Sequence, residues 1–423
     1  MHAAKQRVAG VPGKLKLLLV AWTILGVAAA LRLALGTRRP ALLDSQLEEG
    51  KAPTGQPAAA LRRPRASAAQ LTVGLLIDAR STAPAAEAAP SGPLSSQLDC
   101  NPDQPPHKLT DREVDMQQQR RCALARANGR PPGGYVALCL AVKNQHRELP
   151  EYLDYYRRLG VSQVYAMEDP QSDPPLKDVL RPFVQDGFVT HRLMPAPDVM
   201  RAEVLNATCH EYHVHHKQLM AYTHCLKDYG SNHQWMGFID ADEFVVLTDG
   251  TPDLPTLLRD YEAHGALALN WRMFGSNGHE TRQNNTLLSY TKCNAEQAPE
   301  NTHVKLFANM AYVGRISGPH EALHAPGYYT VNTSRQRVNG SFSSPIDHSR
   351  AALNHYILRS KEEFREKRLR GSAMRVKPKP WQYWRDTEAT MTEQCDTGVR
   401  AWQRLYGAPA PQRGQHRRMG RGT

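Results

Sequence analysis

Three acidic residues follow directly on a short apolar stretch near the middle of the chain. The stretch from Trp235 to Ile239 has the composition of a buried strand, and Asp240, Asp242 and Glu243 come immediately after it. Side chains at positions i and i+2 of a strand point to the same face, so Asp240 and Asp242 are predicted to aim two carboxylates at one Mn²⁺ or Mg²⁺ ion. Ligands of open α/β sheets bind beyond the carboxyl ends of the strands. The alternative interpretation is a strand that ends in a solvated acidic turn.

The residues before this motif alternate between strand and helix patterns. Tyr135 to Val142 is a continuous apolar run, which is typical of a strand buried on both faces of a parallel sheet. Helices are predicted over 149–159 and 176–183, and strands over 163–167 and 187–192. This alternation is typical of βαβ units and predicts an α/β fold.

The residues around and after the motif continue the mixed pattern. Helical spacing predicts helices over 213–227, 254–264 and 361–369, and apolar runs predict strands over 266–271, 304–308 and 312–314. After Gly371 the sequence is basic and rich in Trp, Pro and Arg, and it predicts no defined structure. The chain has no internal repeat.

The positive charge of the chain lies at its ends. The formal net charge is +12, yet residues 1–70 and 361–423 together carry +16, so the middle of the chain carries −4. A nucleic-acid-binding groove would place the basic residues on the folded part. The distribution therefore argues against a nucleic-acid partner.

The amino-terminal segment has the composition of a membrane anchor. Residues 17–35 are apolar apart from Thr23 and Arg32, and four basic residues precede them. This pattern predicts a signal anchor with a cytoplasmic amino terminus and a lumenal remainder. A signal peptide cleaved near Ala28 to Ala30 is the main alternative, and a transit peptide is another.

These features divide the chain into five predicted parts. Residues 1–16 form a cytoplasmic tail, 17–35 the anchor, 36–132 a largely disordered stem, 133–371 the folded domain and 372–423 a basic tail. The stem is rich in Ala, Pro, Ser, Gln and Arg, and a helical piece around 109–127 joins it to the folded domain.

Glycosylation sequons and cysteines agree with a secretory route. Sequons of the form N-x-S/T begin at Asn206, Asn284, Asn332 and Asn339. The seven cysteines show no C-x-x-C metal spacing, and a lumenal setting would permit disulfides, with at least one cysteine left unpaired. Cys139 lies inside an apolar strand and is interpreted as a core residue.

A βαβ region followed about 100 residues later by a hydrophobic strand and D-x-D describes a nucleotide-sugar transferase of the GT-A type. Over residues 135–371 the chain resembles glycosyltransferase family 92 and its relatives. Five segments carry this resemblance: 142–144 with 149–153 and 159–161, then 168–173, 235–244, 271–279, and 354–356 through Phe364, Lys367 and Arg370. The chain departs from the family at Gln145, where relatives usually have Glu, so the role of this residue is in doubt.

The resemblance implies a GT-A fold, in which helices flank a Rossmann-like mixed sheet, and an inverting transfer of a hexose. The implied donor is UDP-galactose, the cofactor Mn²⁺ or Mg²⁺, and the acceptor a glycan. Together with the predicted signal anchor, this function predicts a Golgi membrane protein with a single type II span and a lumenal catalytic domain. Asp240 and Asp242 would hold the metal and the diphosphate, and Lys143, Asn144 and either Glu168 or Asp169 would lie near uridine. His355 would be a third metal ligand or a phosphate contact, or else a hydrogen-bonded core histidine. Lys361, Lys367 and Arg370 would clamp phosphate, or form the solvated face of a helix.

An inverting transfer also needs a base that takes the proton of the acceptor hydroxyl. Glu280, Glu321 and Asp347 are the candidates, and Glu321 is favoured. Trp271 and Phe274 are candidates for stacking on a sugar, or for the core.

Two other functions compete with glycosyl transfer. His320-Glu321-Ala-Leu-His324 matches H-E-x-x-H, the pattern of zinc proteases, but Pro319 and Pro326-Gly327 leave no room for the helix that this motif needs. A non-catalytic carbohydrate-binding module is the other alternative. The histidines at 210, 213, 215 and 216 lack neighbouring carboxylates and are interpreted as part of a solvated loop and helix start.

Overall fold

Strand β1 (Val136–Val142) lies in the middle of the first half of the central sheet, and its seven residues alternate between two hydrophobic cores. Val136, Leu138 and Leu140 face one core, whereas Ala137 and Cys139 face the other, as the two-residue period of a strand requires. Both faces are buried, which confirms the strand predicted from the apolar run. The computed structural model describes residues 108–195, 199, 216–371 and 378–407.

Three further strands complete a parallel half-sheet. β2 (Gln163–Glu168) and β4 (Trp235–Phe238) pair with β1 on either side, and β3 (Val189–Leu193) pairs with β2. Helices α3 (Leu149–Arg158) and α4 (Lys177–Gln185) connect β1 to β2 and β2 to β3. These are the βαβ units that the sequence predicted, with ends shifted by one or two residues.

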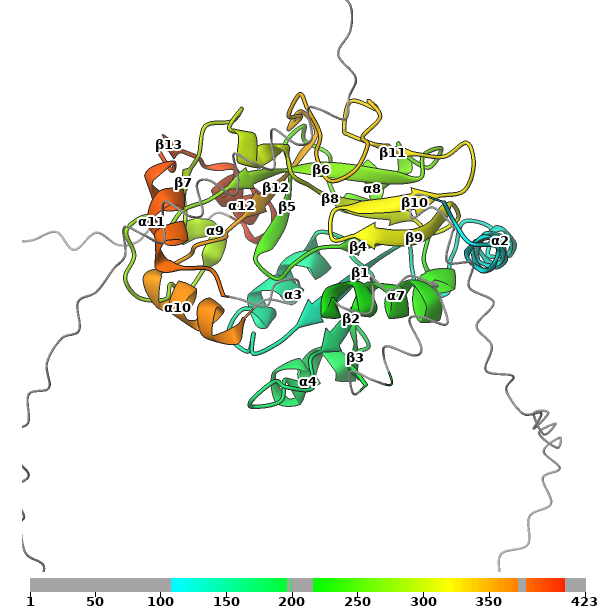
Figure 1. Cartoon of the computed structure of the whole chain (residues 1–423), viewed down its shortest axis with the longest axis horizontal. Helices are drawn as coiled ribbons and strands as arrows, with labels where there is room; N and C mark the ends of the chain where they lie inside the picture. The colour runs from blue at the N-terminus through cyan, green and yellow to red at the C-terminus, as the bar shows by residue number, and fades with distance from the viewer. Residues whose placement is uncertain (1–107, 196–198, 200–215, 372–377, 408–423) are drawn as a thin grey trace, which may run out of the picture. The chain divides into compact units, whose positions relative to one another are not determined.

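The other half of the sheet is mixed. The full order is β3-β2-β1-β4-β8-β6-β12-β5, with β11 as a further partner of β6 (Figure 1). The strands of this half are β5 (Glu243–Leu247), β6 (Ala266–Met273), β8 (Val304–Asn309), β11 (Thr330–Val331) and β12 (Ala351–His355). β8 runs antiparallel to both β4 and β6, whereas β12 runs parallel to β6 and antiparallel to β5. The mixed α/β sheet confirms the predicted fold class.

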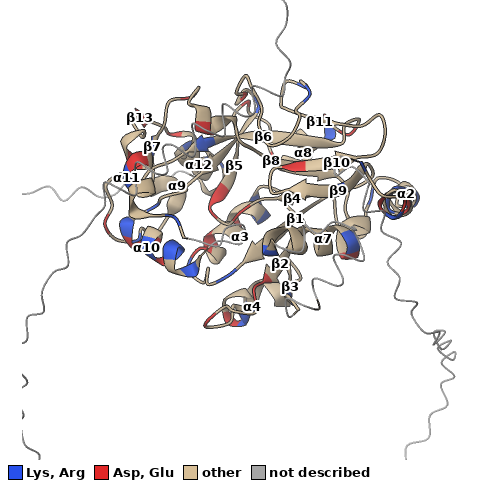
Figure 2. Cartoon of the chain, viewed as in Figure 1, with Lys and Arg blue, Asp and Glu red and all other residues tan. Residues whose placement is uncertain are grey.

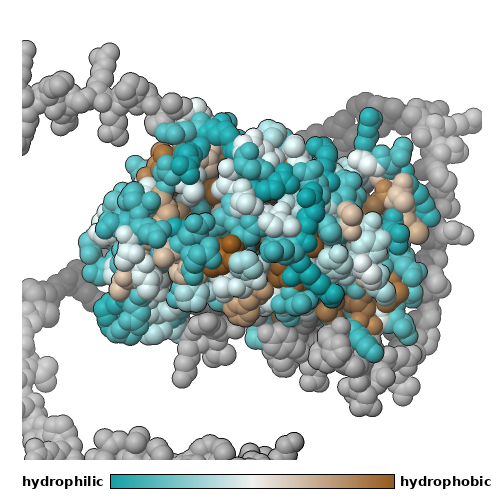
Figure 3. All heavy atoms as spheres, turned by 90° about the horizontal axis from the view of Figure 1, so that it is seen from above, coloured by the Kyte–Doolittle hydropathy of each residue, from teal (hydrophilic) through white to brown (hydrophobic). Residues whose placement is uncertain are grey.

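The remaining elements lie around this sheet. The helices are α7 (Lys217–Tyr229), α8 (Leu254–Arg259), α9 (Thr286–Ser289) and α10 (Lys361–Arg370), with short 3₁₀ turns η1 (Gly230–Asn232) and η2 (Pro299–Thr302). β9 (Val313–Gly318) and β10 (Glu321–His324) form a separate hairpin. The surface in Figure 3 is mostly hydrophilic, with small and separate apolar patches.

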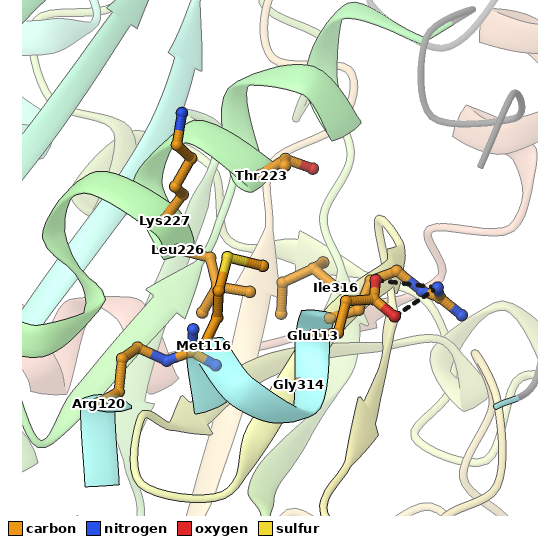
Figure 4. Close-up of a pocket in the computed structure, with 9 residues that line it drawn as sticks. Glu113, Met116, Arg120, Thr223, Leu226, Lys227, Gly314 and Ile316 are labelled. Carbon is orange, nitrogen blue, oxygen red and sulfur yellow. Dashed lines mark hydrogen bonds and ion pairs between the residues drawn. The ribbon is translucent and has the colours of Figure 1, made fainter. Parts of the chain in front are cut away.

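Helix α2 (Asp111–Arg126) packs against the domain from within the range predicted as stem. Thr110 and Glu113 form a capping box at its start, and the buried Glu113 carboxylate accepts hydrogen bonds from Arg315 of β9 at 3.0 Å (Figure 4). Arg120 of the same helix donates to the carbonyl oxygen of Met310 at 3.4 Å. The folded part therefore begins before residue 133, where the sequence analysis placed its boundary.

The folded part also continues beyond Gly371. Helices α11 (Trp381–Ala389) and α12 (Thr397–Tyr406) follow, and β13 (Glu393–Gln394) pairs with β7 (Lys292–Cys293). A disulfide joins Cys293 to Cys395. Residues 378–407 are therefore part of the domain rather than of a basic tail, because burial of α12 and this cross-link tie them to it.

A second disulfide corrects the interpretation of Cys139. It joins Cys139 of β1 to Cys225 of α7, so this residue is not a plain core side chain. Cys122 is a free cysteine, whereas Cys100 and Cys209 lie outside the described residues.

The predicted anchor at 17–35 also lies outside the described residues, as do the sequon at Asn206 and the histidines from 210 to 215. In the part of the chain that the structure describes, no helix has both the length and the hydrophobicity needed to cross a bilayer.

We expect acid to destabilise the fold through His233. This fully buried imidazole donates from Nδ1 to the carbonyl oxygen of Gly134 and accepts from the Tyr165 hydroxyl at 2.7 Å, which is the pattern of a neutral ring. Burial lowers the pKa of His233 from 6.5 to about 4. The unfolded chain therefore binds the proton first, so this contribution to stability is complete above pH 6.5 and is lost as the pH falls to about 4.

The contribution of His233 at neutral pH is about 3 kcal/mol. Urea unfolding of wild type and His233→Asn between pH 7 and 4 measures it, since the difference between the two free energies of unfolding should shrink by this amount. Parallel curves for the two proteins would contradict the prediction.

Candidate functional site

The acidic motif forms a tight turn between two strands rather than the end of one strand. β4 ends at Phe238 and β5 begins at Glu243, and the backbone N–H of Glu243 donates to the carbonyl oxygen of Asp240 at 3.0 Å. The two strands are not neighbours in the sheet, because β5 pairs with β12 at the far edge. The i, i+2 strand geometry assumed in the sequence analysis is therefore wrong, and a turn presents the carboxylates.

Backbone hydrogen bonds from distant segments hold this turn in place. The N–H of Tyr356 donates to the carbonyl oxygen of Asp242 at 2.9 Å, and the guanidinium of Arg359 donates to that of Ala241 at 3.2 Å. Both donors follow β12, so the carboxyl end of β12 and the turn are fixed together.

Asp240 is paired with a lysine from the neighbouring strand. Its Oδ2 accepts from Lys305 Nζ at 2.9 Å, and its Oδ1 accepts from Gln218 Nε2 of α7 at 2.6 Å. The Lys305 side chain is fully buried. Burial works to lower the pKa of Lys305, but the negative charges of Asp240 and Glu243 outweigh it and hold this pKa above its ordinary range.

Glu243 is buried behind the turn and does not line the cleft. Its Oε2 accepts from the backbone N–H of Asp240 at 2.8 Å and lies 3.7 Å from Lys305 Nζ. Burial raises the pKa of this carboxyl from 4.5 to about 8, and the charge of Asp240 adds to the effect. It is therefore a structural acid, and the third carboxylate of the motif is not available to a ligand.

Asp242 is paired with a different lysine side chain, from α10. Its Oδ2 accepts from Lys367 Nζ of α10 at 2.5 Å and lies 3.7 Å from His355 Nε2. Burial of Asp242 works to raise its pKa, but Lys367 and His355 outweigh burial and keep that pKa well below its ordinary range. Burial lowers the pKa of His355 to about 4, so a neutral imidazole stands beside an ionised carboxylate.

Asp240 and Asp242 both line a cleft of about 730 Å³. The cleft is bordered by residues after β1 and β2 on one side of the turn, and by residues of β6, β8, β12 and α10 on the other. The charged and polar side chains that line it include Lys143, Asp169, Gln171, Lys217, Gln218, Glu300, His303, Lys305, His320, His355, Lys367, Arg368 and Arg370.

The residues predicted to lie near uridine divide into two pairs. Lys143 and Asp169 line the cleft, and Asp169 accepts from Lys217 Nζ at 2.8 Å. Asn144 and Glu168 do not line it. Asn144 caps a loop by accepting from the N–H of Asp173, and Glu168 is buried against His191, at 2.6 Å. The latter pair are structural.

The three candidates for the base lie away from the cleft. Glu321, the favoured one, is on β10 and is not among the lining residues, because the hairpin turns its neighbour His320 toward the cleft instead. Glu280 pairs with Lys361 at 3.2 Å on the surface, and Asp347 accepts from the Thr333 hydroxyl at 2.6 Å. None of these carboxylates is therefore positioned at the turn.

The basic helix α10 places two of its three predicted residues in the cleft. Lys367 and Arg370 line it together with Arg368, whereas Lys361 is exposed and pairs with Glu280. Lys and Arg colour several stretches of α10 in Figure 2. The interpretation of all three as a solvated face is therefore wrong for Lys367 and Arg370. Of the two aromatic candidates, Trp271 lines the cleft and Phe274 is in the core.

The H-E-x-x-H segment is a β-hairpin rather than a helix. His320 precedes β10 and His324 ends it, and their imidazoles have separate partners. His320 Nδ1 donates to the carbonyl oxygen of Val304 at 2.7 Å, whereas His324 Nε2 contacts the hydroxyl of Thr330 at 2.9 Å. The two histidines therefore lack the one-turn helical spacing of a zinc protease.

Sequence reasoning missed several lining residues. Lys305 could have been found, since a lysine inside the apolar run Val304 to Ala308 must have a buried counter-charge. Lys217, Gln218, Glu300 and His303 carry no such signal, because folding alone brings their segments to the turn.

The side chains at the turn are of the chemical types that bind a divalent cation. Carboxylate oxygens with one imidazole are suitable ligands for Mn²⁺, and Asp240 is 38% exposed. Across the described residues, three side chains of metal-binding type come within 4.8 Å only at Cys293, Glu393 and Cys395, where the cysteines form the disulfide. The ligand atoms of Asp240, Asp242 and His355 therefore do not all lie within this distance of one another in the structure, although all three residues line the same cleft.

Part of the chain is similar in sequence to a protein of a named family. A rice protein (Oryza sativa subsp. japonica) named as a glycosyltransferase family 92 protein is 28% identical over 147 residues, which are 34% of this chain and 22% of the rice protein. The match thus spans about a fifth of that relative. The crystal structure of a mycobacterial protein aligns over 37% of this chain and 45% of its own, at 13% identity and a TM-score of 0.22, which is too low to bear on the fold.

The pattern that defines glycosyltransferase family 92 matches residues 135–392. This span covers more than half of the chain and contains the acidic turn, the cleft and helices α3, α4 and α7 to α11. It begins one residue before β1 and ends after α11, whereas α2 and α12 of the folded part lie outside it. The chain belongs to glycosyltransferase family 92.

Proposed function

We propose that this glycosyltransferase moves a hexose, galactose from UDP-galactose, onto a glycan acceptor with inversion and with Mn²⁺ or Mg²⁺. The observation that carries the proposal is that Asp240 and Asp242 line the same cleft as several lysine and arginine side chains. The choice of UDP-galactose and of inversion is supported by the resemblance to the family.

The diphosphate of the donor would lie at the acidic turn. Lys367 and Arg370 of α10 and Lys217 of α7 approach this part of the cleft from different elements, so their charges can neutralise a diphosphate from several sides. Asp240, Asp242 and His355 would hold the cation, whose chemistry when bound is that of a Lewis acid on the phosphate oxygens. Lysine contacts leave lone pairs on both carboxylates for this role.

The uridine of the donor would lie at the carboxyl ends of β1 and β2. Lys143, Asp169 and Gln171 line the cleft there, and Gln171 accepts from Lys143 Nζ at 3.4 Å and from Lys217 Nζ at 3.2 Å. These side chains offer both donors and acceptors to a base and a ribose. The position also agrees with the general location of ligands in open α/β sheets.

The proton of the acceptor hydroxyl would be taken on the other side of the turn. Glu300, His303 and His320 are the groups of suitable chemistry that line the cleft there. Both imidazoles donate from Nδ1 to backbone carbonyl oxygens, of Glu300 and Val304, which leaves each Nε2 as a proton acceptor.

A lumenal location, with a single type II span in the Golgi membrane, is part of the proposal. The disulfides Cys139–Cys225 and Cys293–Cys395 support it, because such bonds persist in the secretory pathway and are rare in the cytosol. No observation favours a zinc protease, and a non-catalytic sugar-binding module would not need the paired charges at the turn.

Asp242→Asn should lower the rate of transfer by at least about 100-fold, because the amide cannot hold a cation or balance Lys367. The measurement is incorporation of radiolabelled galactose from UDP-galactose into a glycan panel, with Mn²⁺ and with a chelator. Glu280→Gln, which changes an exposed carboxylate outside the cleft, is the matched control. Full activity of Asp242→Asn, or of wild type in chelator, would refute the metal role.

Glu321→Gln should transfer sugar within about twofold of wild type, because the carboxylate does not line the cleft and surface changes are usually mild. The same assay tests it beside Glu300→Gln, His303→Gln and His320→Gln. We expect one of the latter three to lose at least about 100-fold in kcat. A comparable loss in Glu321→Gln would restore it as the base.

Glycans should be found at Asn284 and Asn339 but not at Asn332 when the protein passes through a secretory pathway. Asn284 and Asn339 are exposed, whereas Asn332 is buried and its side chain binds Ser334 and Gln336. A glycan at Asn332 would therefore prevent this local fold. Mass spectrometry of glycopeptides measures the occupancy, and substantial glycosylation of Asn332 in folded protein would contradict the structure.

A further inference from the structure

Four aromatic rings form a row that begins at the acidic turn. His355, which lies against Asp242, has its ring centroid 4.3 Å from that of Trp271. Trp271 stacks on His303 at 4.7 Å with an interplanar angle of 15°. His303 meets Phe342 edge to face at 4.6 Å. We call these four residues the ring row, and it runs from the turn to the surface.

The outer end of the ring row is an unusual residue. Phe342 is 56% exposed, and of the eight phenylalanines of the chain, all within the described residues, it alone is an exposed one. The backbone on both sides of it is paired, since Ser343 N–H donates to the carbonyl oxygen of Thr302 at 2.8 Å and Val304 N–H to that of Ser341 at 3.3 Å. The exposed ring is therefore held beside the start of β8.

The ring row lies on the side of the turn opposite to the nucleotide. The proposed uridine site is formed after β1 and β2, whereas Trp271 is on β6, His303 precedes β8 and His355 ends β12. In the sheet, β4 separates these two groups of strands. A donor that lies across the turn would leave the ring row for the other substrate.

The chemistry of the ring row suits a carbohydrate. Pyranose rings present a face of C–H groups that packs on aromatic rings, while their hydroxyls need hydrogen-bond partners. His303 and His320 offer acceptor nitrogens beside Trp271, because each Nδ1 is already used as a donor to a backbone carbonyl. Apolar faces and polar edges thus alternate along the row.

We propose that the ring row binds a glycan acceptor of at least two sugar units, with the sugar that receives the hexose near Trp271 and the next unit on Phe342. This inference rests on the proposed function and adds that the enzyme prefers an extended acceptor to a single sugar. Phe342 is a specificity-determining residue, since it lies too far out along the row to contact the reacting atoms.

The test compares acceptors of one and four units from galactose, glucose and N-acetylglucosamine series with the full-length protein. Wild type should show a higher kcat/KM for the tetrasaccharide than for the monosaccharide of the preferred series. Phe342→Ala should lower this ratio by about tenfold, while the KM for UDP-galactose stays within twofold. Tyr329→Ala, which removes another exposed aromatic ring that contacts His264 rather than the ring row, should leave the ratio unchanged.

Two further variants separate recognition from folding. Phe342→Tyr should keep the wild-type ratio of kcat/KM for the tetrasaccharide to that for the monosaccharide, because the flat ring is retained. Phe342→Leu should lower this ratio without changing the melting temperature. A Leu variant with the wild-type ratio, or a wild type without length preference, would overturn the inference while leaving the transferase intact.

If no sugar is transferred to any acceptor, the proposed function is refuted. A binding measurement then still tests the inference about the ring row. Calorimetric titration with the same tetrasaccharides should show weaker binding to Phe342→Ala than to wild type. Equal binding would overturn the role of Phe342.

Discussion

A fully buried lysine between two acids is the interaction on which the centre of this structure depends. Lys305 extends from β8 to Asp240, while Glu243 lies behind the pair. An unpaired charge in this position would be costly, so the two strands that carry these residues must meet at the turn. Lys305 thus pairs with Asp240, whereas Asp242 pairs with a separate lysine, Lys367 of α10.

The same charges explain how the cleft can receive a strongly anionic substrate. Lys305 and Lys367 come from the sheet and from α10, and each already contacts one carboxylate of the turn. A diphosphate with a cation would enter a site whose positive and negative groups are both in place, so little rearrangement is needed before the leaving group is stabilised. The aromatic side of the cleft adds apolar surface for a sugar.

Much of the first half of the fold could be predicted from the sequence. The apolar run of β1 and the alternation of helix and strand patterns through α3, β2, α4 and β3 are local. Such patterns can be recognised without knowing which elements pack against them. β5 and β12 were missed for the opposite reason. Each is only five residues long and includes polar or charged residues, Glu243 in β5 and Asn354 and His355 in β12, so neither forms a continuous apolar run like that of β1. The end of the domain was also missed, since α11 buries no residue fully and Cys395 is cross-linked to a residue 102 positions earlier.

By itself the sequence determined the βαβ region, the acidic motif after a buried strand and the family. Each of these depends on short stretches of neighbouring residues that can be recognised without knowing their tertiary contacts. Only the tertiary structure decided which acids face the cleft. Glu243 is adjacent to Asp242 in sequence, yet Glu243 is buried inside the turn, whereas Asp242 lines the cleft beside Lys367. Glu321 and His320 are likewise neighbours that the hairpin separates. The physical reason is that the charge and direction of a side chain depend on burial and on partners supplied by distant strands, which no local pattern contains.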